Sequence, residues 1–502
     1  MESLEASSLI SFCFLLLIFL LLRRPRRSGS GCGLPPGPRP LPVLGNILDL
    51  GTKPHRTLAE HARKHGPVMT LKLGTVTVVV VSSHEAAREV LQKNDHVMAS
   101  RTIPDVVRAR DHYKHSLVWL PNSAKWKGFR RACSMQLFSR QKLDVTEMLR
   151  QRKVDELLDY LHENSVRGKA VTVGQAVFTT VLNLISNTLF SIDLTHHKEN
   201  SVVEFKELIW GMMKEGGSPN ISDFFPALRW IDPQGARRRM DAHFSQLFAV
   251  FDRIVEERTL KRASTDGSPR SDDMLESLLD LRDSSELNRE DINSILAVSI
   301  YDLVVAGVDT THTTVEWAMV ELLRHAEKMA KARAEIEQVL GKDTKVQESD
   351  IPRLPYLRAV VKETFRLYSP FLLPHRAETE VDLCGFKIPK DTQIMVNLWA
   401  MGRDESVWQD PDRFEPERFL ELKIDIKGTD FELIPFGAGR RMCPGMPLGY
   451  RMVHLILGSL IRSFDWKLAN GEATETMDMN EKNGITIQKA KPLCAVPIQL
   501  RR

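Results

Sequence analysis

The chain of 502 residues contains little cysteine, and its cysteines do not occur in close pairs. The six are spread singly along the sequence, at Cys13, Cys32, Cys133, Cys384, Cys443 and Cys494. Disulfide-stapled domains and structural zinc sites need closely spaced cysteines, so neither is expected here. Sparse, unpaired cysteine is typical of a protein body that faces a reducing compartment such as the cytosol.

An excess of charge of one sign is also absent. The formal net charge is only +4 at pH 7, whereas binding to nucleic-acid phosphates requires a strongly basic surface. The sequence shows no internal repeat either. It therefore predicts no nucleic-acid partner.

The chain begins with a long apolar segment. Residues 8–22 are almost wholly apolar, and four arginines follow within residues 23–27. With residues 4–6 the segment reaches the lower length limit of a membrane-spanning helix. A cleaved signal peptide, the alternative, would carry its basic residues before the apolar part. We therefore predict an N-terminal membrane anchor at residues 4–22, with the main body facing the cytosol. The short span suits the thin bilayer of the endoplasmic reticulum.

Residues 23–42 are basic and then rich in proline, which predicts a semi-rigid hinge rather than a helix. Residues 43–502 form the expected catalytic domain. Alternating apolar residues predict two strands of a hairpin at 68–73 and 76–81, and strand patterns return at 381–388. Helical spacing dominates elsewhere, for example at 153–161 and 316–340. The fold class is therefore mostly α with a small β portion.

The segment from Phe436 to Gly445 fits the pattern FxxGxRxCxG. Glycines at positions 437 and 439 allow tight turns, so the loop can present Cys443 as a thiolate ligand to a haem iron. Arg441 is placed to pair with a haem propionate, and Pro444 can begin a following helix. The alternative is a buried structural cysteine beside a glycine turn.

With this segment the sequence resembles the cytochrome P-450 family of haem-thiolate monooxygenases, from about Leu34 to the C-terminus. The resemblance implies the cytochrome P-450 fold and haem b bound through Cys443. It also implies O2 as a substrate and electrons from NADPH. Those electrons would arrive through a separate NADPH–cytochrome P-450 reductase, because the chain lacks a flavin- or nucleotide-binding module.

Residues 306–311 resemble the oxygen-activating segment of that family and lie within a long helical pattern. Thr310 would hold an ordered water near the distal oxygen, and Asp309 would supply protons from outside. The alternative is a helix with a back-bonded threonine and a solvated aspartate.

A second set of residues resembles the structural network of the family. Glu363 and Arg366 lie at i and i+3 on one helical face, and Arg418 matches the third member. Losing one member would leave a buried charge unpaired. We expect a structural rather than a catalytic role.

Two segments match family positions that contact the haem propionates. Trp126 and Arg130 lie one helical turn apart, and the alternative for them is an exposed basic helix edge. The strand around Leu373–Ala377 places His375 where many relatives carry arginine, with Arg376 next. Either side chain would serve, and alignment favours His375.

The resemblance also implies a substrate pocket on the distal face of the haem, with Val304, Ala306, Phe371, Leu372 and Ile485 as its candidate residues. The apolar character of Phe371, Leu372 and Leu373 predicts a small lipophilic substrate.

Several sequence segments, such as Phe178–Leu184 and Phe431–Phe436, resemble those of the plant subgroup of geraniol hydroxylases and other terpenoid oxidases. The resemblance implies hydroxylation of a terpenoid, with a monoterpenol such as geraniol as the best single guess. Alkaloid or phenolic substrates remain alternatives, as do a haem-thiolate isomerase or dehydratase without reductase and a non-catalytic haem carrier. The segment Arg366–Pro370 reads RLYSP where relatives commonly read RLHPP. Because the loop that follows borders the pocket, the resemblance alone does not define the substrate.

Overall fold

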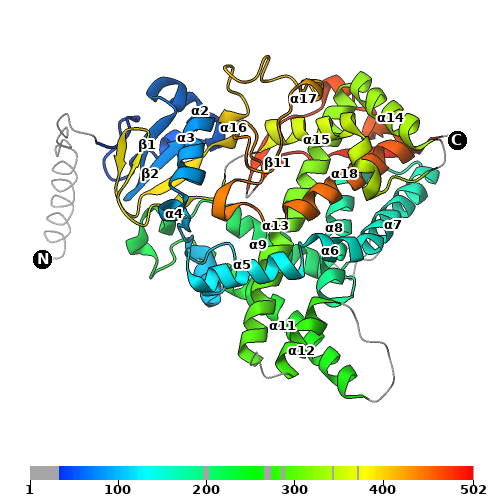
Figure 1. The fold of residues 1–502 in the computed structure, drawn as a ribbon, viewed down its shortest axis with the longest axis horizontal. Coiled ribbons are helices and arrows are strands. Elements are labelled where there is room, and N and C mark those ends of the chain that lie inside the picture. The colour runs from blue at the N-terminus through cyan, green and yellow to red at the C-terminus, as the bar shows by residue number, and fades with distance from the viewer. Residues whose placement is uncertain are drawn as a thin grey trace, which may run out of the picture.

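The computed structural model describes residues 33–195, 203–264, 273–283, 289–341, 344–369, 372–484 and 486–500. The expected anchor at 4–22 and residues 23–32 of the expected hinge lie outside this part. The described chain is mostly helical with a small β portion, as predicted. In Figure 1 the sheet that contains β1 and β2 lies at one end of the molecule, β11 lies nearer its middle, and helices make up most of the remainder.

The helices extend over these bounds: α2 Pro54–His65, α3 His84–Arg88, α4 Asp95–Met98, α5 Ala124–Gln136, α6 Arg140–Val145, α7 Glu147–Val166, α8 Val173–Phe190, α9 Val203–Gly217, α10 Ile221–Phe224, α11 Ala236–Ala263, α12 Met274–Asp283, α13 Arg289–Arg324, α14 Ala326–Leu340, α15 Pro355–Tyr368, α16 Leu398–Met401, α17 Arg418–Glu421 and α18 Met446–Ser463. The 3₁₀ segment η3 extends over Asp105–Lys114.

The strands are β1 Val68–Leu73, β2 Val76–Val81, β3 Ser100–Arg101, β4 Val171–Thr172, β5 His375–Arg376, β6 Val381–Leu383, β7 Phe386–Ile388, β8 Gln393–Val396, β9 Phe464–Leu468, β10 Glu481–Asn483, β11 Ile487–Lys489 and β12 Cys494–Gln499. The largest sheet has the order β1-β2-β8-β5-β3. The predicted hairpin is confirmed, because β1 and β2 pair antiparallel with Val68 opposite Val81. β8 then joins β2 in parallel, so residues distant in sequence complete the sheet.

Helix α13 crosses the middle of the helical body, with α8 packed along it and α15 and α18 on other sides (Figure 1). α8 is apolar around most of its circumference, and such a helix must be buried on all sides. Among the described residues, α8 is the one helix long and apolar enough to cross a bilayer, and 83% of it is buried inside the protein. It is a core helix of this body.

Two expected helix boundaries differ in the structure. The helical pattern at 316–340 is divided between α13 and α14, because His325 adopts a non-helical backbone (φ −121°, ψ 75°). α18 begins at Met446 after Gly445, with Pro447 rather than Pro444 in its first turn. In both places the hydrophobic spacing continues across a boundary that only the backbone angles reveal.

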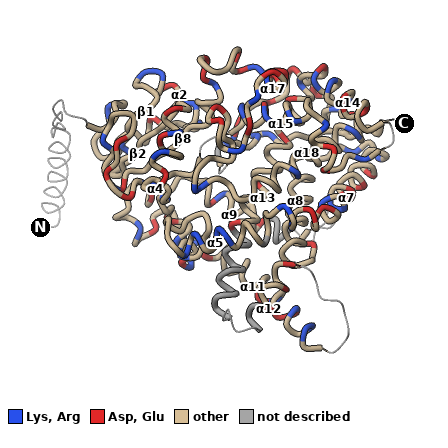
Figure 2. Tube along the Cα trace, in the orientation of Figure 1, with Lys and Arg blue, Asp and Glu red and all other residues tan. Residues whose placement is uncertain are grey.

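Acidic and basic residues are interspersed along the backbone trace in Figure 2, and no extended stretch of one sign is visible among the described residues. This distribution agrees with the small net charge of the chain.

Candidate active site

A cavity lies between α13 and the loop that carries Cys443. Its walls are mostly apolar, with a group of cationic and aromatic side chains among them. The residues that border the cavity include Arg101, Trp126, Arg130, Asp302, Ala306, Thr310, Tyr368, Leu372, His375, Arg441, Cys443 and Thr486. Segments from most of the described chain therefore meet at one place.

Cys443 lies at the wall of this cavity, so its exposed surface faces the cavity. Its backbone N–H donates to the carbonyl of Phe436 at 2.8 Å, which closes the loop. Gly439 has φ +66°, and a Cβ atom there would lie 2.0 Å from the carbonyl oxygen of Leu91. The tight loop therefore requires glycine at this position.

Burial raises the pKa of the Cys443 thiol, while backbone N–H groups of Gly445 and Met446 and the charge of Arg130 lower it. These N–H groups lie where α18 begins, and a helix N-terminus favours an anion. The thiolate that a metal needs as ligand is thus supported from the protein side, and a bound cation would complete its stabilisation.

Three arginines border the same cavity without an acidic partner. Among the described residues, Arg101, Arg130 and Arg441 form no ion pair with a carboxylate, and they donate to the main-chain carbonyls of Leu373, Met442 and Ala99 instead. Burial and the charge of Arg130 lower the pKa of Arg441 to about 10, and burial and the charge of Arg441 lower that of Arg101 to about 9. Buried cations of this kind need an anion between them.

An aromatic ring organises two of these arginines. The guanidinium of Arg441 lies 4.2 Å from the centre of the Trp126 ring, and that of Arg130 lies 5.6 Å away. The indole N–H of Trp126 donates to the carbonyl of Leu117 at 3.0 Å, which holds the ring in place. Arg441 Nε donates to the carbonyl of Ala99 at 2.6 Å. Trp126 and Arg130 therefore face the cavity rather than an exposed helix edge.

His375 and Arg376 point in different directions from β5. His375 is buried at the cavity, and its Nδ1 lies 2.7 Å from the carbonyl of Met98. Burial, Arg101 and Arg441 lower the pKa of His375 to about 3. Arg376 instead forms an exposed ion pair with Asp391 at 3.6 Å. Of the two alternatives, only His375 borders the cavity.

The predicted α13 segment presents its two functional residues differently. Thr310 borders the cavity with Ala306, and its hydroxyl donates to the carbonyl of Ala306 at 2.7 Å. Asp309 is buried on another side, where Thr486 Oγ1 and Gln488 Nε2 donate to its carboxylate at 2.8 and 2.7 Å. Asp309 is therefore connected to the cavity through Thr486, which borders it.

The expected pocket residues have mixed positions. Ala306 and Leu372 border the cavity, whereas Phe371 and Ile485 lie outside the described residues. Val304 was expected on the pocket face but is fully buried in the core and does not border the cavity. On a helix, position 304 is about 200° away from positions 302 and 306, so that expectation was wrong.

The structural network lies outside the cavity and is closed on itself. Arg366 donates to the two oxygens of Glu363 at 2.7 and 2.8 Å, and Arg418 donates to one of them at 3.1 Å. Further N–H groups of Arg366 donate to the carbonyls of Pro411 and Arg413 at 2.6 and 3.0 Å. The structure brings the three predicted members together.

Comparison with known proteins agrees with this geometry. The family model described as Cytochrome P450 matches residues 35–495. Geraniol 8-hydroxylase of Swertia mussotii is 49% identical over 98% of each chain, and that of Catharanthus roseus is 50% identical over 93% of this chain and 94% of its own. Cytochrome P450 76AD1 of Beta vulgaris is 51% identical over 93% of each chain. The chain belongs to the cytochrome P450 family.

Members of this family are haem-thiolate enzymes that act as monooxygenases, with electrons from NADPH delivered through a reductase. The residues of the cavity fit such a cofactor. Unpaired buried arginines suit its two carboxylates, a thiol supported by backbone N–H groups suits its iron, and apolar walls suit its macrocycle.

Proposed function

We propose that this protein hydroxylates a small lipophilic plant metabolite, a terpenoid, with a monoterpenol such as geraniol as the preferred substrate. The observation that carries the proposal is the apolar cavity that contains both the thiol of Cys443 and the distal face of α13. The names of two relatives, geraniol 8-hydroxylase, support the choice of substrate.

Bound haem would supply the chemistry that activates dioxygen. Cys443 would ligate the iron, and Arg101, Trp126, Arg130, His375 and Arg441 would hold the propionates. The apolar residues Ala306 and Leu372 would orient the substrate and exclude water from it.

Two residues of α13 manage protons in this proposal. The hydroxyl of Thr310 donates to the carbonyl of Ala306, so its oxygen keeps lone pairs for an ordered water at the cavity wall. Burial raises the pKa of Asp309, with His312 and the donors Thr486 and Gln488 opposing. Asp309 thus retains a proton more readily than a solvated aspartate, and Thr486 connects it to the cavity.

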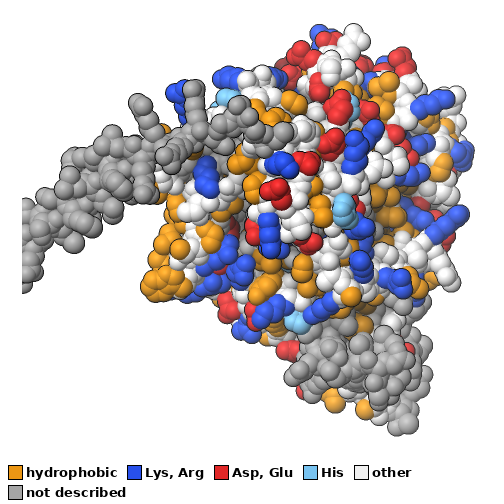
Figure 3. Space-filling model, turned by 60° about the vertical axis from the view of Figure 1, so that its left-hand side comes forward, with side chains coloured by type: hydrophobic (Ala, Val, Ile, Leu, Met, Phe, Trp, Pro, Cys, Tyr) orange, Lys and Arg blue, Asp and Glu red, His pale blue; other side chains and the backbone are white. Residues whose placement is uncertain are grey.

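We place the protein on the endoplasmic reticulum membrane, with a single-pass anchor at 4–22 and the body in the cytosol. Exposed apolar side chains support this placement. They flank the turn between β1 and β2, where Gly74 donates to Leu44 and Thr75 donates to Phe224. Figure 3 shows hydrophobic side chains gathered on this side of the molecule. The set comprises Leu41, Val43, Leu44, Leu48, Ile221, Trp230 and Ile231. Membrane lipid would cover it.

The test uses microsomes that contain this chain and a plant reductase, supplied with NADPH, labelled oxygen and a panel of mono-, sesqui- and diterpenes. Mass spectrometry should detect a terpenoid product that carries one labelled oxygen. Products only from alkaloid or phenolic substrates would refute the terpenoid proposal and leave the monooxygenase. Turnover without reductase would indicate an isomerase or dehydratase instead.

Two variants test the assigned residues. Cys443→Ser should abolish the thiolate-type spectrum with carbon monoxide, and an unchanged spectrum would refute the ligand. Thr310→Ala should divert electrons to peroxide, measured as a lower ratio of product to NADPH consumed. A ratio equal to that of the wild type would refute the proton role.

A further inference from the structure

One acidic side chain borders the cavity among the described residues, that of Asp302. It lies on α13 four residues before Ala306 and eight before Thr310, and these spacings place all three on one face of the helix. The walls around it are mostly apolar. A carboxylate in such surroundings is costly unless donors surround it.

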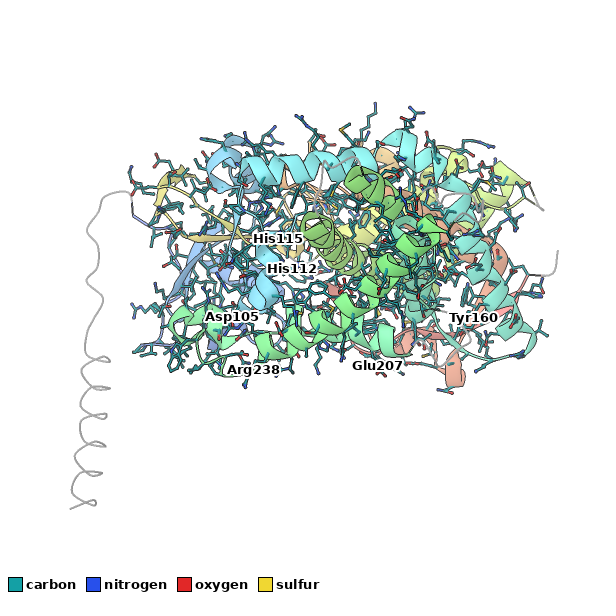
Figure 4. The ribbon with its side chains drawn as sticks, turned by 90° about the horizontal axis from the view of Figure 1, so that it is seen from below. Asp105, His112, His115, Tyr160, Glu207 and Arg238 are labelled. Carbon is teal, nitrogen blue, oxygen red and sulfur yellow. The ribbon has the colours of Figure 1, made fainter. Side chains whose placement is uncertain are left out.

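The donors come from η3 and the residues directly after it. Ser116 Oγ donates to one oxygen of Asp302 at 2.6 Å, and the N–H of Val118 donates to the same oxygen at 3.3 Å. The Nε2 atom of His112 lies 3.2 Å from the other oxygen. Figure 4 shows His112 and His115 near the middle of the molecule, among the helices.

This arrangement holds the carboxylate firmly but does not use its full capacity. His112 is buried and stacks on Phe244 with 4.9 Å between ring centres, and Ser116 is fully buried. A carboxylate offers about four acceptor positions, and His112, Ser116 and Val118 occupy three of them. No lysine or arginine of the described chain forms an ion pair with Asp302.

We infer that Asp302, positioned by His112 and Ser116, binds a hydroxyl or amino group of the substrate. This inference rests on the proposed function and narrows it. The preferred substrates are lipophilic molecules with one hydrogen-bond donor at an end, such as a terpenol, rather than the hydrocarbons of the same skeleton.

The same placement selects the site of oxidation. Asp302 and Thr310 are separated by eight residues, which is about 12 Å along a helix. A substrate bound by its hydroxyl at Asp302 extends along this face toward Thr310 and the thiol side of the cavity. Hydroxylation then occurs at the end of the molecule that is distant from its own hydroxyl group.

The test compares geraniol with the hydrocarbon of the same skeleton that lacks the hydroxyl group. Binding is measured on the haem-loaded full-length protein from the substrate-induced change in its absorbance spectrum, independent of turnover. Asp302→Asn keeps the shape of the side chain and removes its charge. It should weaken geraniol binding roughly tenfold or more and leave hydrocarbon binding within about twofold.

Glu316→Gln is the matched control. Glu316 is also a buried acid on α13, but it accepts the N–H of Leu493 at 2.8 Å and does not border the cavity. This variant should change neither dissociation constant. The carbon-monoxide spectrum of each variant verifies that its haem site is intact.

The outcomes separate the two proposals. Equal binding of alcohol and hydrocarbon by the wild type, or equal weakening of both by Asp302→Asn, would overturn the role of Asp302 and leave terpenoid hydroxylation standing. Selective weakening without any labelled product would support the anchor and refute the proposed function. An absence of spectral response to both ligands would overturn both proposals.

Discussion

Among the buried charges of the described residues, the Glu363 network and the arginines of the cavity differ in whether their charges are matched. Glu363 is shared between Arg366 and Arg418, and carbonyl groups accept the remaining N–H groups of Arg366. Arg101 and Arg441 lie at the cavity with lowered pKa values and without an acid. The first group is complete within the chain, whereas the second becomes complete only with an anion from outside.

This contrast distinguishes structural from binding residues without reference to any motif. A closed network contributes to the folded state, and the loss of one member leaves a charge unpaired. An open group costs free energy in the isolated chain and recovers it when the ligand binds. Substitutions in the two groups should therefore affect different measurements.

Breaking the closed network should have the largest effect. Glu363→Gln leaves Arg366 and Arg418 without a counter-charge, and we expect about 3–5 kcal/mol of destabilisation, with little folded protein recovered. Chemical unfolding and the yield of haem-loaded protein measure it. Lys93→Ala, which removes a surface pair with Glu89, is the control and should cost under about 1 kcal/mol. Similar costs for the two variants would contradict the contrast.

A third cluster is intermediate, because it is partly matched. Asp105 is fully buried and pairs with Arg237 at 3.2 Å, and its N–H donates to Asp223 at 2.7 Å. One oxygen of Asp105 and the Nε of Arg229 have no hydrogen-bond partner. Burial raises the pKa of Asp223 to about 6.

The raised pKa of Asp223 predicts a dependence of stability on pH. The pKa of Asp223 is higher in the folded state than in the unfolded state. Its stabilisation of the folded state is therefore fully present below about pH 4 and is lost as the pH rises through about 6. Asp223→Asn should remove this loss. Its free energy of unfolding at pH 8 should exceed that of the wild type by roughly 3 kcal/mol. Urea unfolding between pH 5 and 8 measures the difference. Parallel stability curves for both proteins would refute it.

Removing one of the unpaired arginines at the cavity should weaken haem retention rather than folding. Arg441→Met removes one buried cation, and loss of its charge-assisted contacts, worth about 1.5–3 kcal/mol, should speed haem transfer to an acceptor protein roughly 10- to 100-fold. The neighbouring Arg440 is exposed and lies 3.5 Å from Asp95, so Arg440→Met is the control. Equal haem loss from both variants would refute the assignment of Arg441.

The smallest expected effect comes from Arg376, and a comparison with its neighbour His375 on β5 tests which of the two contacts the haem. Arg376→Ala removes only an exposed ion pair with Asp391 and should change stability by under about 1 kcal/mol, without haem loss. His375→Leu should accelerate haem loss, because His375 borders the cavity. Haem-transfer rates for both variants measure this. The reverse order of rates would assign the propionate contact to Arg376.

Local patterns made part of this structure predictable. The hairpin at 68–81 has strand alternation and a glycine between its strands, and the loop around Cys443 contains its functional residues within ten positions. Glu363 and Arg366 are one helical turn apart. In each case the residues that act together are close in sequence, so spacing alone indicates the geometry.

The remainder depends on contacts between distant segments. Arg101 belongs to a two-residue strand that pairs with His375, and no local pattern indicates this pairing. Asp302 is held at the cavity by a distant segment, because its donors Ser116 and His112 lie 186 and 190 residues away. Val304 shows the opposite error, because an apolar residue near the pocket segment belongs to the core.

These contacts between distant segments also have a consequence for biosynthesis. Arg441 donates to a carbonyl 342 residues earlier in the chain, and β8 pairs with β2 across a similar separation. A ribosome that adds about 5–20 residues per second releases the first of these segments many seconds before its partner. The cavity wall cannot close until nearly the whole chain has emerged. The nascent protein is therefore expected to acquire its cofactor late, and chaperones would have to protect the unpaired strands in the meantime.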